Sequence, residues 1–533
     1  MSGNKSVAII GAGISGLAAA RHFLHDGWDV VLFDRSDGPN IGGVWPQAYD
    51  FVRLQNSSHH YHFADFPFPD KVDFNPTKAQ LVDYFTAFAR HYDISRRIRF
   101  LSEVVDIEAR DGSVPGWKLT IINKASTYRE EYDFIVNAQG YFSIPKMPVV
   151  QGQDLFSGEI VHSSKILHTT AFKPNSKIVV VGTGKTALDF CVAAAGKDAT
   201  VHQVVLTAHW TIPQYLLGFV HFNNAFFTRI NTVMMPSWFH LPFEAKLHRG
   251  QRVVSRQEDA NWDPILNCAP LVAVFWRMVQ FLIAFSSGWR SDDALYPKHS
   301  ILKDMRNSIS VLPTEYNEMV RKNRIQVHSA ATISRVSEKE VYLSDGSVIS
   351  NVDLIVMATG YDSSRNCLVP KDKVHLVEED GIYLYKHVVH PDLPNMCFAT
   401  AHSIMLLATV DMSLHLATSW LRGEAYLPSR EQQLAEIDRV RAWKRVNFGS
   451  EPHRALSVLT RFQQYLDEIC VELGVNPLRK VARLGWWNPY AWIKEFLGWY
   501  VVEDYEFYAI RKEIATAHGK RQMGCNSPVP VEE

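Results

Sequence analysis

The stretch VAIIGAGISG, residues 7–16, decides the first part of the fold. Its leading apolar residues predict a strand, its spaced glycines a tight turn, and the apolar spacing of residues 17–25 a helix. In this arrangement the glycines admit a close backbone approach, and the helix N-terminus presents free N–H groups to a pyrophosphate. We therefore predict a dinucleotide site whose contacts include Gly11, Gly13, Ser15 and Gly16.

A second apolar run, residues 29–33, is followed by Asp34 and Arg35. A carboxylate about 20 residues beyond such a glycine turn accepts hydrogen bonds from the hydroxyl groups of a ribose. Because the strand and the helix on either side of the turn also fit, we interpret Asp34 and Arg35 as further cofactor contacts.

The same pattern recurs in KIVVVGTGKTA, residues 177–187. Alanine in the third position of the turn still lets the helix pack closely on the strand. Two dinucleotide turns in one chain imply two cofactors that must meet, and the usual pairing is FAD with a nicotinamide donor. We assign the first turn to FAD and the second to NAD(P)H, with contacts from Gly182, Gly184, Lys185, Thr186 and Ala187.

The composition narrows the possible partners. A chain of 533 residues suggests two to four domains, and its net charge of −1 offers no field that would attract nucleic acid. The six cysteines form no Cys-x-x-Cys pair, so neither a metal site nor a redox dithiol is indicated.

The sequence also bears on location. A strand that begins at Val7 leaves no room for a signal peptide, so we expect a cytoplasmic protein. The apolar run from Leu271 to Phe285 contains Arg277 and Gln280 and is shorter than the roughly 20 residues that a spanning helix needs. We predict a buried or interfacial helix here, which allows contact with a membrane surface but not a membrane span.

Several further stretches carry a family resemblance. They are GGVW (42–45), LQNSS (54–58), FADFPFP (63–69), FSGEIVH (156–162) and ATGYD (358–362). As a set they resemble the class B flavin-containing monooxygenases. Similarity to the plant and fungal branch comes from HWTIP (209–213), YPKHS (296–300) and LGVNP (473–477).

The resemblance implies an α/β fold with two Rossmann-like dinucleotide-binding domains, for FAD and NAD(P)H, the second inserted in the first, and a helical C-terminal extension. The strand at 352–357, before Ala358, is expected to return to the first sheet. The expected boundaries are 1–168 and 321–425 for the FAD domain, 169–320 for the NAD(P)H domain, 426–520 for the extension and 521–533 for a disordered tail.

Two aromatic-rich segments have more than one interpretation. Residues 214–290 of the NAD(P)H domain form a long excursion that we interpret as a lid or substrate-access element, with local packing as the alternative. The Trp-rich segment 486–499 either meets a partner or membrane surface or covers the FAD domain.

The resemblance also implies roles for individual residues. Asn56 matches the amide placed near the oxygen-reacting carbon of the flavin, where an uncharged donor protects the oxygen adduct. Trp45 has a core residue as its alternative interpretation. Further implied cofactor contacts are Gly42, Gly43, Val44, Trp45, Asn56, Val104, Thr359 and Gly360.

The segment between the two domains matches the family's linker motif at Phe156, Gly158 and His162. Its last position is Ile166, where related Baeyer–Villiger enzymes carry Trp, so their motif is excluded without the heteroatom-oxygenating one being fully met. We expect the three matching residues to act conformationally, as a linker that bends when the nicotinamide domain moves, with a purely structural histidine as the alternative.

The nicotinamide site lacks an expected residue. After the strand at 199–206, many family members place an Arg that binds a 2′-phosphate, but this chain has Thr207 and His209. Together with Lys185 these residues can supply hydrogen bonds. NADPH is our choice from the resemblance, and NADH is the alternative.

The resemblance implies that NAD(P)H reduces FAD, that the flavin then binds O₂ at C4a, and that one oxygen atom passes to a small organic substrate. Nitrogen or sulfur is the expected site of attack, because no nucleophile, metal motif or paired carboxylates accompany the turns. The alternatives are Baeyer–Villiger oxygenation of a ketone, an uncoupled NAD(P)H oxidase and a non-catalytic partner protein. The sequence leaves the substrate and the oligomeric state open.

Overall fold

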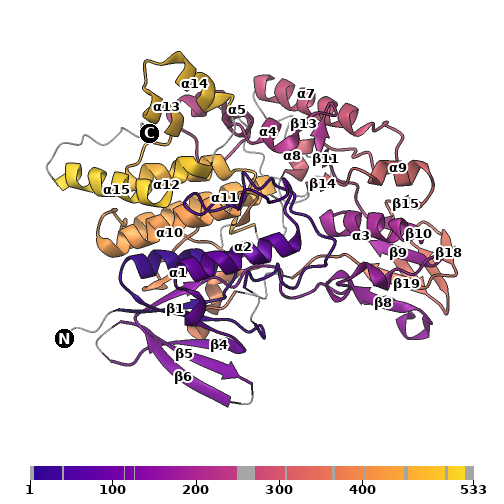
Figure 1. Ribbon diagram of the computed structural model, residues 1–533, viewed down its shortest axis with the longest axis horizontal. Helices are drawn as coiled ribbons and strands as arrows, with labels where there is room; N and C mark the ends of the chain where they lie inside the picture. The colour runs from indigo at the N-terminus through magenta and orange to yellow at the C-terminus, as the bar shows by residue number, and fades with distance from the viewer. Residues whose placement is uncertain are drawn as a thin grey trace.

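The computed structural model describes residues 5–38, 41–112, 115–124, 126–248, 270–305, 309–362, 367–399, 402–448, 454–498 and 502–522. Two parallel sheets dominate it, one at the lower left of Figure 1 and one at the right. Residues 523–533 of the predicted disordered tail, and residues 249–269 of the aromatic-rich excursion, lie outside the described residues.

The first sheet surrounds the strand that precedes the first glycine turn. Its order is β22-β7-β1-β2-β3, and all its pairs are parallel. The strands are β1 (Ser6–Ile10), β2 (Asp29–Phe33), β3 (Ile98–Arg99), β7 (Phe134–Asn137) and β22 (Met396–Phe398). Because β22 comes from late in the chain, the first unit closes only when residues near 400 return to it.

Different layers cover the two faces of this sheet. One face packs against helices α1 (Ile14–His25), α2 (Lys78–His91) and α10 (Leu406–Arg422). The other face packs against an antiparallel sheet of β4 (Ser102–Ala109), β5 (Trp117–Asn123) and β6 (Ser126–Tyr132). Buried apolar side chains on both faces explain the continuous apolar runs of the strands.

The second sheet has the order β15-β10-β9-β19-β8, again entirely parallel. Its strands are β8 (Glu159–His162), β9 (Lys177–Val181), β10 (Thr200–Val205), β15 (Ile325–Ser329) and β19 (Leu354–Met357). Helices α3 (Lys185–Gly196) and α9 (Tyr316–Arg321) pack on one face. A small antiparallel sheet packs on the other, formed by β16 (Ile333–Val336), β17 (Glu340–Leu343) and β18 (Val348–Ser350).

The position of β19 corrects one prediction. Leu354 pairs with Ile178 of β9 and with Glu159 of β8, so the expectation that residues 352–357 return to the first sheet is wrong. The strands of the second sheet therefore run from 159 to 357, across the expected boundaries at 168 and 320. A buried parallel strand is apolar on both faces in either sheet, so its pattern does not choose between them.

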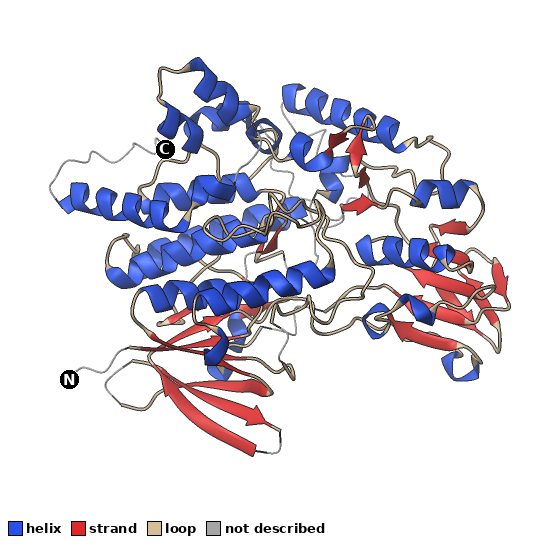
Figure 2. Ribbon diagram, in the orientation of Figure 1, coloured by secondary structure: helices blue, strands red, loops and turns tan. Residues whose placement is uncertain are grey.

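A third, largely helical core joins the aromatic-rich excursion to the C-terminal part of the chain. Figure 2 shows these helices above the two sheets. In the excursion they are α4 (Phe222–Phe226), α5 (Arg229–Val233), α6 (Pro242–Ala245) and α7 (Pro270–Ser287), and α8 (Ile301–Asp304) follows it. In the C-terminal part they are α11 (Arg430–Phe448), α12 (Phe462–Leu473), α13 (Arg479–Leu484), α14 (Pro489–Phe496) and α15 (Phe507–Gln522).

Short strands complete the set of described strands. They are β11 (Thr211–Pro213), β12 (Tyr215–Leu216), β13 (Val220–His221), β14 (Ser310–Leu312), β20 (Val377–Glu378), β21 (Gly381–Ile382), β23 (His402–Ser403) and β24 (Ser457–Leu459). The last helix returns to the first unit, where Arg511 of α15 forms an ion pair with Asp26, the residue that ends α1. Helix α15 thus packs on the helical face of the first unit, whereas Trp486 and Trp487 of the Trp-rich segment remain exposed.

Candidate active site

The glycines of the first turn differ in whether the fold would tolerate a side chain at their position. Gly11 has a φ of +106°, and a Cβ there would lie 2.5 Å from the carbonyl oxygen of Ala138. A Cβ on Gly16 would lie 1.9 Å from the carbonyl oxygen of Gly11, so the fold itself requires both glycines. At Gly13 the nearest atom would be the Cα of Gly43, at 3.6 Å, so the protein alone does not forbid a side chain there.

The N-terminus of α1 is suited to a phosphate. The helix starts after Gly13 with no side-chain cap, and Ser15 lies in its first turn, so the first N–H groups lack a capping side chain. Gly43 lies against the same turn with a φ of +66°, and a Cβ there would be 2.9 Å from the Cα of Gly13. The GGVW segment and the glycine turn therefore form one backbone cradle, beside which Gly42 has a φ of +126°.

Asp34 lies at the edge of this cradle. Its Oδ2 accepts a 2.8 Å hydrogen bond from the N–H of Ala12, and its Oδ1 accepts from both the N–H and the hydroxyl of Ser36. Oδ2 therefore retains a lone pair for a ribose. Val104 is buried in β4, two residues after Ser102, whose N–H donates to the carbonyl oxygen of Asp34. An uncapped helix end, a bare backbone turn and an adjacent carboxylate together fit a dinucleotide such as FAD.

Three other predicted FAD contacts are placed less specifically. Arg35 is half exposed, and its guanidinium is 3.7 Å from the carboxylate of Glu103. Val44 is exposed, and Trp45 packs edge-on against Tyr61 at 6.3 Å between ring centroids. The packing of Trp45 agrees with its interpretation as a core residue and does not test a cofactor contact.

The second turn, like the first, combines a glycine that the fold requires with one where the protein alone would admit a side chain. Gly182 has a φ of +135°, and a Cβ there would lie 2.5 Å from the carbonyl oxygen of Ala358 and 3.5 Å from the Cβ of Ala187. A Cβ on Gly184 would meet nothing within 4 Å, and α3 starts after Gly184 without a side-chain cap. The open space above Gly184 and the free helix end fit a second pyrophosphate.

Lys185 and Thr186 begin α3, but the ammonium group of Lys185 is already engaged. It forms an ion pair with Asp189, one helical turn later. The same carboxylate accepts a 2.7 Å hydrogen bond from the hydroxyl of Tyr49, which belongs to the first unit. Lys185 therefore helps to join the two units, and its charge is partly neutralised before any cofactor binds.

Asn56 lies in a loop that is fixed from several sides. The side-chain amide of Asn75 donates to the carbonyl oxygens of residues 54, 55 and 56 at 3.1–3.2 Å. The side-chain oxygen of Asn223 accepts a 2.8 Å hydrogen bond from the N–H of Ser57. Asn56 itself donates to the carbonyl oxygen of Ile404 at 2.5 Å. The sequence reading missed Asn75 and Asn223, because a lone Asn far along the chain carries no local signal.

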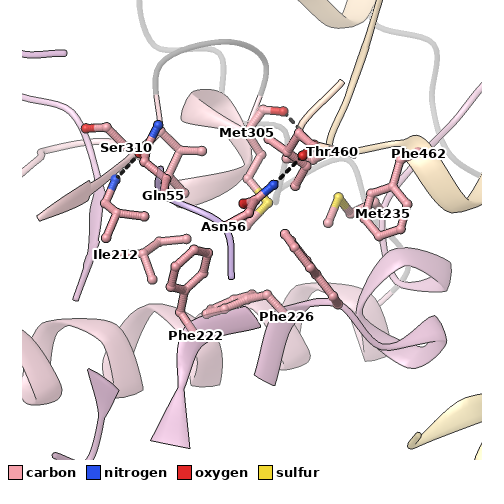
Figure 3. Close-up of a pocket in the computed structure, with 14 residues that line it drawn as sticks. Gln55, Asn56, Ile212, Phe222, Phe226, Met235, Met305, Ser310, Thr460 and Phe462 are labelled. Atoms are coloured by element: carbon pink, nitrogen blue, oxygen red, sulfur yellow. Dashed lines mark hydrogen bonds between the residues drawn. The ribbon is translucent and has the colours of Figure 1, made fainter. Parts of the chain in front are cut away.

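Asn56 also lines a cavity of about 80 Å³ (Figure 3). Aromatic side chains of the excursion form one wall, and none of the described residues that line the cavity is ionisable. The lining residues are Gln55, Asn56, Ile212, Phe222, Phe226, Phe227, Met235, Met305, Ile309, Ser310, Val311, Ile404, Thr460 and Phe462. The arrangement places two neutral amides, those of Gln55 and Asn56, beside a space lined mainly by apolar side chains.

Comparison with known proteins identifies the family. Residues 4–243 and 294–506 match the Flavin-binding monooxygenase-like family. The chain belongs to this family. It is 26% identical over 532 residues to the probable flavin-containing monooxygenase 1 of Arabidopsis thaliana. The alignment covers 90% of this chain and 93% of that protein. The predicted family and enzyme class, a flavin-dependent monooxygenase, are thereby confirmed.

Two solved structures share the fold. S-allyl-L-cysteine S-oxygenase from Allium sativum superposes with a TM-score of 0.56 at 18% identity and covers 96% of this chain and 99% of that one. Cyclohexanone monooxygenase from Rhodococcus sp. Phi1, bound to NADP⁺, gives a TM-score of 0.61 at 18% identity and covers 88% and 97%. The predicted two-unit α/β fold is therefore that of known flavin monooxygenases.

In this monooxygenase the linker histidine connects two strand ends. Nε2 of His162 donates to the carbonyl oxygen of Gly360 at 2.9 Å, and Nδ1 accepts from the N–H of Ser164. Burial lowers the pKa of His162, so the neutral ring that suits these contacts is favoured. Gly158 is also required sterically, since a Cβ there would be 2.5 Å from the carbonyl oxygen of Asp353.

The remaining linker residues and the ATG stretch lie nearby. Phe156 packs in the core below the second sheet, and Ile166 is buried in the core on its other face. Thr359 donates its hydroxyl to the carbonyl oxygen of Lys146, and Gly360 has a φ of +76°. Thr359 and Gly360 thus follow the second sheet and contact the segment that leaves the first unit.

The end of β10 leads into a polar region. Thr207 is exposed, whereas the Nδ1 of His209 lies 2.8 Å from a carboxylate oxygen of Asp304, and the Nε2 of His299 lies at the same distance from that oxygen. Burial alone would raise the pKa of the Asp304 carboxyl, but hydrogen bonds from the two imidazoles lower it overall. Asp304 was not predicted from the sequence.

A pocket of about 410 Å³ opens beside this cluster. Arg277, Lys298 and His299 line it, and no acidic residue of the described chain does. A second His and Asp cluster, formed by His22, Asp411 and His415, is buried between α1 and α10. His209 and His299 lie 2.8 Å from Asp304, and His22 lies 2.7 Å from Asp411, which is the spacing of hydrogen bonds.

Proposed function

We propose that this flavin monooxygenase transfers one oxygen atom from O₂ to the nitrogen or sulfur of a small, largely apolar organic substrate. The observation that carries the proposal is the neutral amide of Asn56 at the wall of an apolar cavity. When bound, the reduced flavin supplies the activated oxygen. The protein positions the substrate, keeps water out and offers a hydrogen-bond donor that does not titrate.

The lack of ionisable side chains among the described lining residues favours heteroatom oxidation. A soft nucleophile such as an amine or a thioether attacks activated oxygen directly, so it needs no acid–base pair from the protein. The described residues that line the cavity include no acid–base pair. Baeyer–Villiger oxygenation is the second candidate because its enzymes share this fold, but Ile166 packs in the second unit where those enzymes carry Trp.

The test is a direct comparison of products. The purified protein, NADPH and oxygen are incubated in parallel with an aryl alkyl sulfide and with a cyclic ketone. We expect sulfoxide in an amount close to the NADPH consumed, and little lactone. Lactone without sulfoxide would reverse the assignment, and hydrogen peroxide equal to NADPH with every substrate would identify an uncoupled oxidase.

The substitution Asn56→Ala tests the proposed role of the Asn56 amide in oxygen transfer. Without the amide, oxygen transfer should be less well coupled, so the peroxide released per NADPH should rise several-fold. The anaerobic rate of flavin reduction should not change, because the hydride transfer does not use this side chain. Ser310→Ala, in the wall of the same cavity, is the matched control.

We further propose that the donor is NADPH. Trp210, which lines the basic pocket, is three residues after Thr207 in the chain. Thr207 lies just beyond the second strand of the nucleotide fold, where a 2′-phosphate is bound in such folds. Lys298 and the histidines fixed by Asp304 there suit a 2′-phosphate in place of the missing Arg. Lys298→Gln should reduce the preference for NADPH over NADH by about tenfold, the equivalent of one charge-assisted hydrogen bond.

The control for that experiment is Lys322→Gln, because Lys322 is exposed directly after α9 and pairs with Glu318. An unchanged preference in Lys298→Gln would remove the pocket from nucleotide recognition. We also propose that the protein acts in the cytoplasm, with a surface that contacts membranes without spanning them.

A further inference from the structure

Helix α7 is apolar on two opposite faces. Its buried face consists of Val272, Trp276 and Ile283, and the indole N–H of Trp276 donates to the carbonyl oxygen of Met234 just after α5. The opposite face is exposed to solvent, with Phe281 at 73%. At alternating intervals of three and four residues, this exposed stripe is formed by Leu271, Val274, Met278, Phe281 and Phe285.

A second apolar surface lies at the turn between α13 and α14. Trp487 is 98% exposed, which is unusual for so large an apolar side chain. Its exposed apolar neighbours are Leu484, Trp486, Tyr490, Ile493 and Leu497. We call the α7 stripe and this tip together the apolar face.

The two parts of the apolar face flank one helix. Arg229 of α5 binds Glu495 of α14 at 2.9 Å, while the residue after α5 accepts the hydrogen bond from α7. Figure 1 shows α7 and α13–α14 along the same upper edge of the molecule.

The exposed charged side chains of these elements are positive. Arg277 is the single charged residue of α7 and also borders the basic pocket. From residue 479 to 498 the exposed charged side chains are Arg483, which pairs with Asp504, and Lys494, whereas the one acidic residue, Glu495, is buried and paired with Arg229. Trp and Tyr beside Lys and Arg are the combination that settles at the headgroup level of a bilayer, and positive charge favours anionic lipids.

The apolar helix belongs to a part of the chain outside the family match. Residues 244–293, which contain α7, separate the two segments matched to the monooxygenase family. Among the described helices α7 is the one long and apolar enough to cross a bilayer, but its buried face is packed on the protein. Those contacts fit a helix that lies in the membrane plane rather than one that crosses it.

We propose that the apolar face docks the monooxygenase onto the surface of a bilayer containing anionic lipids, with the α13–α14 tip and the α7 stripe inserted to headgroup depth. This inference rests on the peripheral location proposed above and does not depend on the substrate of the enzyme. Trp487 and Phe281 are the main apolar anchors, and Lys494 contributes charge.

The test uses the full chain loaded with FAD and vesicles of phosphatidylcholine, with and without phosphatidylserine. We expect co-sedimentation with the vesicles that contain phosphatidylserine and weaker binding to the neutral ones. Trp486→Ser with Trp487→Ser, and separately Phe281→Ser with Phe285→Ser, should each reduce partitioning at least about tenfold. Lys494→Gln should reduce it about fivefold, and only with the anionic vesicles.

The matched control is Val149→Ser with Leu155→Ser, which removes equally exposed apolar side chains near β8, on the second unit. Flavin absorbance and NADPH oxidation without vesicles should match wild type in every variant, which separates loss of docking from loss of the proposed chemistry. Wild-type protein that binds neither vesicle overturns the proposal, as do face variants that bind like the control. A wild-type dimer that the face variants dissociate also overturns it, because a second copy would then cover the face.

Discussion

At the scale of single residues, Gly182 allows the second turn to fold, and Gly184 leaves space for a ligand beside it. The fold requires Gly182, whose Cβ would collide with the backbone of Ala358. Gly184 has open space above it, so its lack of a side chain matters for what binds there. The sequence pattern predicted both glycines without distinguishing them, because the distinction depends on a strand more than 150 residues later in the chain.

Gly184→Ala should therefore fold normally and bind its nucleotide poorly. The melting temperature should remain that of wild type, while the affinity for NADPH should fall at least about tenfold, since the added methyl occupies the phosphate's approach. Calorimetry or a nucleotide titration of flavin reduction measures this. Gly196→Ala, also with nothing within 4 Å of the added Cβ, is the control and should bind NADPH normally; a destabilised Gly184→Ala would contradict the assignment.

His60 links stability to pH next to the Asn56 loop. It is buried, its Nδ1 lies 2.7 Å from the hydroxyl of Ser57, and its ring packs on Phe227. Burial first, and then the neighbouring histidines, lower its pKa from 6.5 to about 4. The folded state thus holds the neutral ring, while the unfolded state takes up a proton already near pH 6.5.

The stabilisation from neutral His60 is fully present above pH 6.5 and is lost as the pH falls towards 4, by about 3 kcal/mol in total. We expect the free energy of unfolding to decline over this range, and to decline less in His60→Gln, which keeps a polar group beside Ser57 without titrating. Urea denaturation at a series of pH values measures both slopes. Parallel slopes for the two proteins would refute the role of His60.

At the scale of elements, β19 shows where sequence patterns stop being informative. Its four buried apolar residues are compatible with either parallel sheet, and only the pairing with Ile178 and Glu159 decides between them. The strand–turn–helix units were predictable because glycine spacing and helix starts are local. Which sheet a later strand joins depends on contacts between distant segments, which no local pattern records.

His162 connects the end of β8 to the residue that follows β19 by three positions, across neighbouring strands. His162→Ala should loosen this connection and slow the anaerobic reduction of the flavin by NADPH several-fold, because the second unit is positioned less well. The FAD content should remain near one per chain. His162→Asn, which can still donate to the carbonyl oxygen of Gly360, should recover part of the rate; equal rates in all three proteins would make His162 a purely structural residue.

At the scale of the whole molecule, the active site combines segments that no sequence window contains. The family motif singled out Asn56, whose catalytic role remains a proposal, whereas the cavity beside it needs the excursion, the loop before β14, Ile404 and α12 together. Asn75 and Asp304 act by holding other residues. Their roles therefore become visible only in three dimensions.

A buried ion network ties the first and last thirds of the chain together. Arg21 of α1 contacts the carboxylates of Asp65 and Asp411, and all three side chains are nearly inaccessible to solvent. Asp411→Ala leaves Arg21 with one partner and should destabilise the protein by about 3–5 kcal/mol. Asp392→Ala removes the more exposed pair with Arg430 and should change stability by less than about 1 kcal/mol in the same urea titration.

The late return of β22 to the first sheet has a consequence for biosynthesis. The strands of the second sheet have all been translated by residue 357, whereas the sheet that carries the first glycine turn must wait for residues 396–398 and then for α10. The second unit can therefore condense while the nascent chain is still growing. The first unit closes last, so, with FAD assigned to the first glycine turn as the sequence predicts, we expect flavin to be bound late in the maturation of the enzyme.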